Sequence, residues 1–228
     1  MVRPAELFEV APSRRPFRLL AISRLDAQDG AGAGGASESA SASSAARWFA
    51  DLAAAGVDGV QLREKHLGDL ALYDLALAAR AALAPPVRLL VNGRADVALA
   101  AGADGVHLPA DGVPAGALRS RCGERLLIGV STHRLEEVEL ARREGADYVV
   151  FGPVYQTPAK GGQGAPLGPH ALARAAAAGI PVYALGGVTL ERFAEVAAAG
   201  AAGIAAIRLF QRRHELERAV EAARACFA

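Results

Sequence analysis

The chain has 228 residues, of which 52% are hydrophobic and 21% are charged, a composition that supports one large domain or two small ones with a sizeable core. The formal net charge is only +1, so no overall field favours nucleic acid or an anionic membrane surface as a partner. A small anionic substrate could still be held by a few local charges.

The cysteines and the N-terminal residues bear on the compartment. Cys122 and Cys226 lie far apart and form no CxxC pair, which argues against a structural metal site or a disulfide framework and is consistent with a reducing compartment. Residues 1–17 contain no apolar signal-peptide core, and no stretch approaches the ~18 consecutive apolar residues of a membrane span. The sequence therefore predicts a soluble cytoplasmic protein that binds neither nucleic acid nor membrane.

Short β-rich runs alternate along the chain with longer Ala-, Leu-, Arg- and Glu-rich runs of helical spacing. The stretch from helix to strand repeats as "AGVDGV", "AGADGV", "EGADYV" and "AGAAGI", and Gly suits a helix C-terminus because it accepts a left-handed backbone. We interpret the repeat as a structural turn. Eight strands are predicted in chain order, at residues 17–23, 58–64, 87–92, 104–108, 126–131, 147–152, 181–186 and 203–207.

Eight βα units in a chain of this length indicate an α/β protein with a small TIM (β/α)8 barrel as a single domain over residues 17–228, after an N-terminal extension at 1–16. The competing fold is an open doubly wound sheet. That fold usually shows a Gly-rich fingerprint after its first strand, which is missing here. Residues 27–45 instead form a low-complexity Gly/Ala/Ser insertion, interpreted as a mobile loop, with a lid as the alternative.

Active sites of barrels are built from the C-terminal ends of the strands and the loops that follow. Gln61, Arg63 and Lys65 alternate at the end of the second predicted strand, so they share one face while the chain is extended. Such a row suits a phosphate, with Arg as a fork and Lys as a point charge. The third predicted strand ends in Asn92, a neutral amide, followed by Gly93.

The fourth and fifth predicted strands add two histidines. His107 ends the fourth strand and Asp111 follows in the loop; the sequence assigns neither a role. Ser131 or Thr132 at the end of the fifth strand could cap the next helix. His133 is expected at the start of that helix, over the barrel mouth, where an imidazole can transfer a proton near neutral pH. Packing alone is the alternative for this histidine.

The sixth and seventh predicted strands end in segments that suit an anion. Tyr155 and Thr157 follow the sixth strand, and Lys160 opens a Gly-rich stretch that is either a lid over an anion or a long loop. Gly186 and Gly187 follow the seventh strand before a predicted helix, so backbone N–H groups and the helix dipole could hold an oxyanion. Loops after the last two strands are the usual phosphate site of TIM barrels.

Five motifs occur in order between about residue 56 and residue 207: "GVDGVQLREK", "GADGVHL", "GVSTH", "GADYVVFGPVYQT" followed by Lys160, and "IPVYALGGVT". Together they resemble the thiamine phosphate synthase/TenI superfamily. The synthase branch joins a pyrimidine pyrophosphate to a thiazole phosphate and needs Mg²⁺. The TenI-like branch isomerises a carboxylated thiazole phosphate to its aromatic tautomer without a metal.

Two positions favour the second branch. By resemblance, synthases carry two Asp residues that hold Mg²⁺, and here those positions are Gly93 and Gly112, with Asp111 one residue early. "VNGRAD" and "HLP" also resemble the TenI-like branch, whereas "FGPVYQT" keeps the Gly-Pro of the synthases. The last predicted strand is one residue shorter than the family pattern, with Arg208 near the usual Ser, where it either supplies charge to the phosphate or points outward.

The resemblance therefore predicts a thiazole tautomerase, an isomerase of thiamine biosynthesis that acts on a thiazole phosphate with no metal or cofactor. It implies that His133 moves the proton, that the glycine pair holds the phosphate and that the basic row holds the carboxylate. A Mg²⁺-dependent thiamine phosphate synthase and a non-catalytic binder of thiazole phosphate stay open, as does a homo-oligomer. The predicted binding residues are Gln61, Arg63, Lys65, Asn92, Ser131, Thr132, Thr157, Lys160, Gly186, Gly187 and Arg208.

Overall fold

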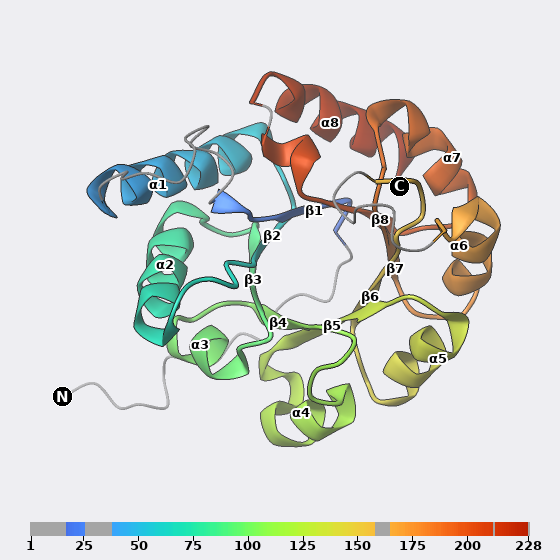
Figure 1. Ribbon diagram of the computed structural model, residues 1–228, viewed down its shortest axis with the longest axis horizontal. Coiled ribbons are helices and arrows are strands. Elements are labelled where there is room, and N and C mark those ends of the chain that lie inside the picture. The colour runs from blue at the N-terminus through green and yellow to red at the C-terminus, as the bar shows by residue number, and fades with distance from the viewer. Residues whose placement is uncertain (1–16, 26–37, 158–164, 212, 228) are drawn as a thin grey trace.

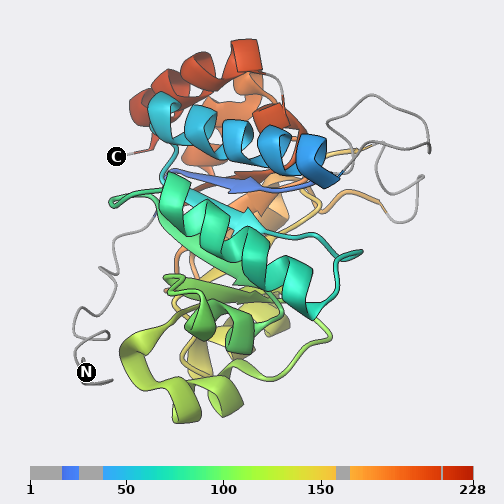
Figure 2. The same ribbon diagram turned by 90° about the vertical axis from the view of Figure 1, so that its left-hand side faces the viewer.

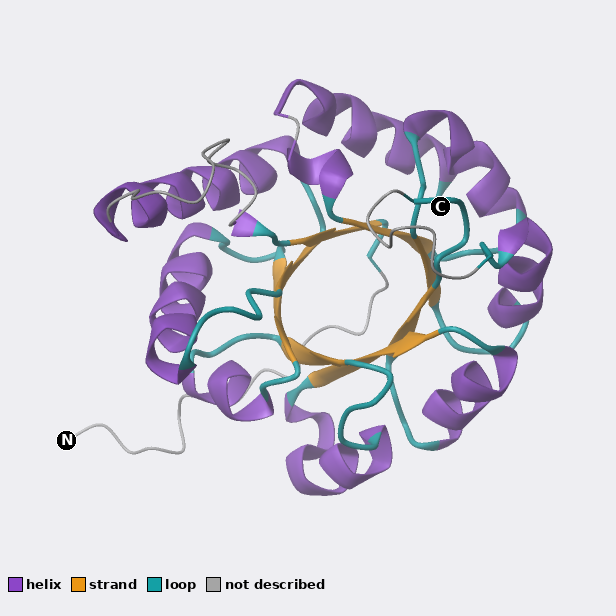
Figure 3. Cartoon of the chain, viewed as in Figure 1, coloured by secondary structure: helices purple, strands orange, loops and turns teal. Residues whose placement is uncertain are grey.

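The computed structural model describes residues 17–25, 38–157, 165–211 and 213–227. Its strands pair in parallel in chain order and close into a barrel, with the last strand pairing back to the first (Figure 3). The predicted TIM barrel is confirmed. The strands are β1 Leu19–Ile22, β2 Gly59–Leu62, β3 Arg88–Asn92, β4 Gly105–Leu108, β5 Leu127–Thr132, β6 Tyr148–Phe151, β7 Val182–Leu185 and β8 Gly203–Ala206.

Helices follow the strands and form a ring around the outside of the barrel (Figures 1 and 2). Within the described ranges, no helix is both long and apolar enough to span a membrane. The α-helices are α1 Glu38–Ala55, α2 Asp69–Ala82, α3 Ala95–Ala100, α4 Ala115–Cys122, α5 Leu135–Arg143, α6 Gly168–Ala176, α7 Phe193–Ala198 and α8 Arg213–Cys226, and the 3-10 helices are η3 Gly123–Arg125, η5 Leu190–Arg192 and η6 Arg208–Gln211.

The low-complexity insertion predicted at 27–45 is helical in its C-terminal part, because α1 already begins at Glu38. Further along α1, Trp48 and Leu52 are four residues apart and both are buried against the barrel. The rest of the insertion, and the predicted N-terminal extension at 1–16, lie outside the described residues.

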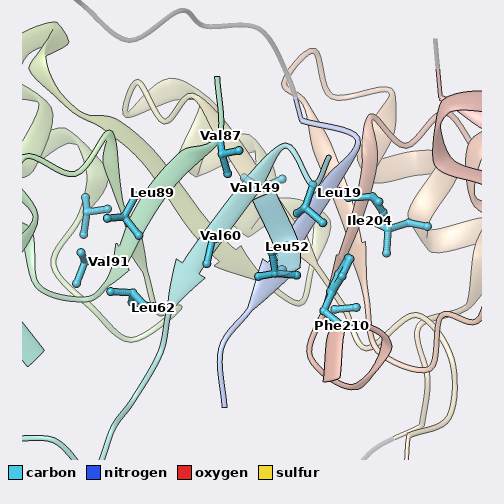
Figure 4. Close-up of a cluster of buried hydrophobic side chains, with 14 of the residues drawn as sticks. Leu19, Leu52, Val60, Leu62, Val87, Leu89, Val91, Val149, Ile204 and Phe210 are labelled. Carbon is cyan, nitrogen blue, oxygen red and sulfur yellow. The ribbon is translucent and has the colours of Figure 1, made fainter. Parts of the chain in front are cut away.

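Strand alternation divides the core into two layers, since successive side chains of a strand point to opposite faces. Outward-facing residues such as Leu19, Val60 and Ile204 pack beneath the helices, where Leu52 of α1 and Phe210 of η6 meet them (Figure 4). The second layer fills the barrel interior and consists of Phe17, Leu20, Ile22, Leu90, Leu127, Tyr148, Val150, Tyr183 and Ala205.

The Asp of the repeated helix-to-strand turn has a structural role. Asp104 Oδ2 accepts a hydrogen bond from Leu89 N at 2.8 Å, and Asp147 Oδ2 accepts one from Ile128 N at 2.7 Å. Asp58 makes the same kind of contact with the start of β1. Each carboxylate thus ties the start of its own strand to the start of the preceding strand, at the end of the barrel away from the site described next.

Candidate active site

A cavity of about 780 Å³ lies at the C-terminal ends of the strands, the end where TIM barrels carry their active sites. Its size suits a small-molecule ligand. The residues that line it come from the inward-facing positions of the strands and from the loops that follow them. They separate into a charged rim and a floor on which apolar side chains lie beside uncharged polar ones.

The rim is basic on the side of β1 and β2. Arg24, Arg63 and Lys65 line the cavity there, and Arg63 is half-buried while Lys65 is exposed. Asp111 and His133 line the cavity from the loops after β4 and β5. Three cations against two carboxylates, Asp111 and Glu64, give this mouth a net positive charge although the whole chain is close to neutral.

Glu64 also borders the cavity, but its carboxylate is used in holding the loop after β1. It accepts hydrogen bonds from Ser23 Oγ at 2.5 Å and from Leu25 N at 3.2 Å, and it is only 4% exposed. Ser23 Oγ in turn accepts the backbone N–H of Arg63 at 2.8 Å. These bonds link β1 to β2 at the mouth and fix the backbone that carries the basic rim.

Two amides lie on the floor beside the apolar side chains. Gln61 Nε2 donates to Asn92 Oδ1 at 3.0 Å, which orients both amides. Gln61 is 1% exposed, and its Oε1 has no hydrogen-bond partner among the described residues. Because a buried acceptor left without a partner costs about 1–3 kcal/mol, this oxygen suits a donor group of a ligand.

His107, for which the sequence assigned no role, is part of the same floor and is 2% exposed. Its Nε2 lies 2.9 Å from Ser131 Oγ and its Nδ1 lies 3.1 Å from the hydroxyl of Tyr148. Burial, and then the nearby positive charge of Arg63, lower the pKa of His107 to about 3. The imidazole is therefore neutral over the physiological range.

The structure brings most of the predicted site residues together, although it does not test what they do. Lys160 lies outside the described residues. The predicted residues that line the cavity are Gln61, Arg63, Lys65, Asn92, Ser131, His133, Thr157 and Gly186.

Thr132 and Arg208 do not line the cavity, so the structure does not bring these two predicted residues to it. Strand alternation directs Ser131 inward and Thr132 outward, where Thr132 Oγ1 donates to Val150 O at 3.3 Å. After β8, Ile207 lines the cavity, and Arg208 is exposed at the start of η6. A one-residue offset on a strand moves a side chain to the opposite face.

The capping residue predicted for α5 is also wrong. The helix begins two residues after His133, and no side chain caps it. Ser131 bonds His107 and Thr132 bonds β6, so neither reaches the helix start. Instead, Glu137 in the first turn accepts the backbone N–H of His133 at 2.7 Å. This bond holds the exposed His133 at the mouth, before the helix starts.

The glycine pair after β7 allows two loops to touch. Gly186 and Gly187 have φ of +94° and +64°, and a Cβ at Gly186 would lie 2.6 Å from Pro153 Cβ. Gly186 lines the cavity and Gly187 does not. The predicted α-helix does not start directly after the pair, because a 3-10 turn begins first, at Leu190. Close backbone approach is therefore possible here, without an adjoining α-helix N-terminus.

Tyr155 is turned away from the cavity. Its hydroxyl donates to Glu195 Oε2 at 2.7 Å, and the guanidinium of Arg192 lies 4.2 Å from its ring centre. Burial and the Glu195 carboxylate raise the pKa of Tyr155 to about 12. Its contacts are structural.

Sequence reasoning missed Arg24 at the rim and Val150 on the floor, although two-residue periodicity from the strand ends would have found both.

The cavity offers few protein ligands for the Mg²⁺ that the synthase branch needs. Within the described ranges, no cluster of three or more His, Cys, Asp or Glu side chains could hold a metal ion. Asp111 is an exposed carboxylate at the mouth, and Asn92 Oδ1 already accepts the amide of Gln61. Mg²⁺ requires near-octahedral oxygen ligation, so these residues do not fit a metal held by the protein alone.

The fold and the cavity define a TIM barrel with a basic mouth. The chain belongs to the thiamine monophosphate synthase family, whose model matches residues 36–210. It is 49% identical over 156 residues to a putative thiamine-phosphate synthase of Geobacter sulfurreducens, covering 68% of this chain and 73% of that one. It is 41% identical over 179 residues to a thiamine-phosphate synthase of Chlorobium luteolum, covering 76% and 81%.

A solved structure gives the same result. The thiamine phosphate pyrophosphorylase of Pyrococcus furiosus superimposes with a TM-score of 0.75 at 26% identity, covering 93% of this chain and 96% of that one. The prediction of a thiazole tautomerase, and with it of an isomerase, is wrong, because these relatives are named as synthases and none of them as a tautomerase. The tautomerase prediction relied on the absence of carboxylates at Gly93 and Gly112. However, Asp111 still lines the cavity and the rim is basic.

Proposed function

We propose that the protein is a thiamine-phosphate synthase, a transferase that couples hydroxymethylpyrimidine pyrophosphate to a thiazole phosphate. The C–O bond between the pyrimidine methylene and the pyrophosphate breaks. A C–N bond forms between that methylene and the thiazole nitrogen, and the pyrophosphate leaves. The observation that carries the proposal is the basic rim at the mouth of a barrel whose relatives bear this name.

The basic rim supplies the charge that the leaving pyrophosphate requires. Arg63 offers a planar fork for two phosphate oxygens, and Lys65 adds a compact charge on a flexible stem. Arg24 lines the same side of the cavity. Positive charge placed where negative charge develops in the transition state lowers the barrier for departure.

The opposite side of the mouth suits the phosphate of the second substrate. Thr157 and Gly186 line the cavity from the loops after β6 and β7, and His133 lines it from the loop after β5. Gly186 has no side chain of its own, so its backbone can approach a ligand closely. We assign the thiazole phosphate to this side and the pyrophosphate to the basic rim.

The floor suits flat heterocycles. Ile22, Val150, Leu185 and Ile207 form its apolar part, and such surfaces favour the burial of aromatic rings. Gln61 Oε1 is an acceptor without a described partner, which suits an amino group on a ring. The apolar floor also excludes water, which would otherwise compete with the thiazole nitrogen for the methylene carbon.

The test is direct turnover. The purified full chain is incubated with both substrates and Mg²⁺, and thiamine phosphate is measured after oxidation to its fluorescent thiochrome. We expect product to accumulate, and Arg63→Gln to lower kcat/KM by at least about tenfold because a charged contact to the pyrophosphate is lost. Arg121→Gln, at an exposed position on α4, is the matched control and retains activity. Absence of product, under conditions where a known synthase forms it, rejects the proposal.

A further inference from the structure

Three polar side chains form a column from the barrel interior to the cavity floor: Tyr148 on β6, His107 on β4 and Ser131 on β5. The hydroxyl of Tyr148 lies 3.1 Å from His107 Nδ1, and Ser131 Oγ lies 2.9 Å from His107 Nε2. His107 and Ser131 line the cavity, whereas Tyr148 is 3% exposed and lies beneath them. Tyr148 can therefore influence a ligand only through the other two residues.

The backbone is shaped to admit this column. Gly129 pairs with His107 across β4 and β5 and with Tyr148 across β5 and β6. A Cβ at Gly129 would overlap the ring of Tyr148, so only glycine leaves room for it. The ring is also held by Phe17 and Tyr183, whose centroids lie 5.4 Å and 5.5 Å away in edge-to-face contact.

The state of each proton follows from burial. His107 is neutral because burial and the nearby Arg63 lower its pKa, so its ring carries a single N–H. Burial raises the pKa of Tyr148, which therefore keeps its O–H. Within the described part of the chain, His107 Nδ1 is the partner that this hydroxyl has.

The direction of both hydrogen bonds then follows by counting protons. If Nδ1 carried the hydrogen, it would donate to Tyr148, and the buried O–H of Tyr148 would have no acceptor, at a cost of about 1–3 kcal/mol. Tyr148 donating to Nδ1 removes that cost. The ring hydrogen is then on Nε2, which donates to Ser131 Oγ, and the Ser131 hydrogen is not used by His107.

We propose that Tyr148 and His107 are positioning residues that fix the hydroxyl of Ser131 as a hydrogen-bond donor to the ligand. The ligand atom that meets Ser131 must carry a lone pair, as a phosphate oxygen or an unprotonated ring nitrogen does. An amino group is disfavoured at this point of the floor. The inference deepens the proposed function and rests on it only for the identity of the ligand.

Nuclear magnetic resonance of the full-length protein with ¹⁵N-labelled histidine tests the direction of the two hydrogen bonds of His107 without any substrate. His107→Gln identifies the resonances of this residue. We expect a neutral ring protonated on Nε2 near pH 7, and a shift of the Nδ1 resonance in Tyr148→Phe because the hydrogen bond to it is lost. A ring protonated on Nδ1, or on both nitrogens, overturns the proposal.

Binding tests whether Tyr148 acts through Ser131. Calorimetry with inorganic pyrophosphate, and separately with hydroxymethylpyrimidine, is applied to Tyr148→Phe, Ser131→Ala and the double variant. For at least one probe, Tyr148→Phe should weaken binding about three- to tenfold and have no further effect when Ser131 is already Ala. The probe that shows this coupling identifies the acceptor. Equal losses in both backgrounds, or no loss with either probe, contradict the proposal.

Tyr183→Phe is the matched control. Tyr183 packs against Tyr148 in the same interior layer, and its hydroxyl has no partner among the described residues. Removing that hydroxyl should leave the His107 resonances and both affinities unchanged. The resonance measurement needs no turnover. A failure of the proposed hydrogen-bond directions can therefore be distinguished from an absence of synthase activity.

Discussion

The residues of the cavity floor combine burial with hydrogen bonding. Gln61 and His107 are almost fully buried, and each bonds a neighbour that also lines the cavity, Asn92 and Ser131 respectively. Buried polar groups keep their orientation when their partners are fixed, because breaking such a bond leaves an unsatisfied group. The floor is thus arranged before a ligand binds, which lowers the ordering cost of binding.

Burial of His107 makes stability depend on pH. The folded state holds its pKa at about 3, below its usual 6.5, so between these values the unfolded chain binds a proton that the native chain does not. The free energy of unfolding should therefore fall as pH falls below about 6.5, by up to about 1.4 kcal/mol per unit from this residue.

Urea unfolding near pH 7 and near pH 5 measures this dependence. Between pH 7 and pH 5, the free energy of unfolding should fall by about 2 kcal/mol more for the native chain than for His107→Asn, since the variant lacks the titrating ring. The exposed histidines are common to both chains and cancel. Equal losses in the two chains would show that His107 titrates normally.

By resemblance to the synthase branch, Gly93 occupies the position of one of the two metal-binding Asp residues. Its φ is +70°, a conformation that Asp tolerates better than most residues, and an added Cβ would meet only Pro109 Cδ, at 3.8 Å. We expect the native chain without substrate to bind Mg²⁺ weakly, and Gly93→Asp to bind it at least about tenfold more tightly through a second carboxylate near Asp111. Calorimetric titration with MgCl₂ measures both, and tight binding by the native chain would contradict this interpretation.

At the scale of elements, the opposite end of the barrel is held by carboxylates. Asp104 bonds Leu89 N and pairs with Arg80 at 2.6 Å and Arg88 at 3.3 Å. Asp104→Ala should lower the free energy of unfolding by about 2–4 kcal/mol, because a buried N–H loses its acceptor and two guanidinium groups each lose one ion pair. Asp74→Ala, exposed on α2, is the control. Since the site lies at the other end, KM should not change; a change in KM with unchanged stability would contradict this division of roles.

The sequence predicted every strand because the β-rich runs, the helical runs and the Gly-Ala-Asp turns agree with one another. It located the residues at the ends of β2, β3 and β5, where alternation identifies the inward face. It failed for Thr132 and Arg208, because the exact end of a strand decides which face a residue takes. It failed for α1 because Ser and Ala, read as low complexity, are also tolerated in a helix that packs against a barrel.

The branch of the family could not be predicted from two missing side chains. Gly93 and Gly112 are departures from one pattern, but a reaction depends on the whole arrangement of charge at the mouth. Arg24 adds to that charge from the loop after β1, and Asp111 keeps a carboxylate in place. Sequence reasoning gave Asp111 too little weight, as one displaced carboxylate, and did not consider Arg24.

At the scale of the whole molecule, the barrel separates stability from chemistry. Aspartates tie the strands at one end, the interior is filled by Phe17, Tyr148 and Tyr183, and the cavity opens at the other end with its cations on one side. In the proposed function, this polarity would give the leaving pyrophosphate and the incoming thiazole phosphate separate places at one mouth. The two substrates should therefore react with each other and not with water.

Phosphorus-31 resonance of the complete reaction tests that expectation most directly. With both substrates, Mg²⁺ and the full chain, the signals of the pyrimidine pyrophosphate should be replaced by free pyrophosphate, in equal amount to the thiamine phosphate formed. Without the thiazole phosphate, they should persist. Release of pyrophosphate without the thiazole phosphate, or no change with both substrates present, would contradict the assignment of this protein as a synthase.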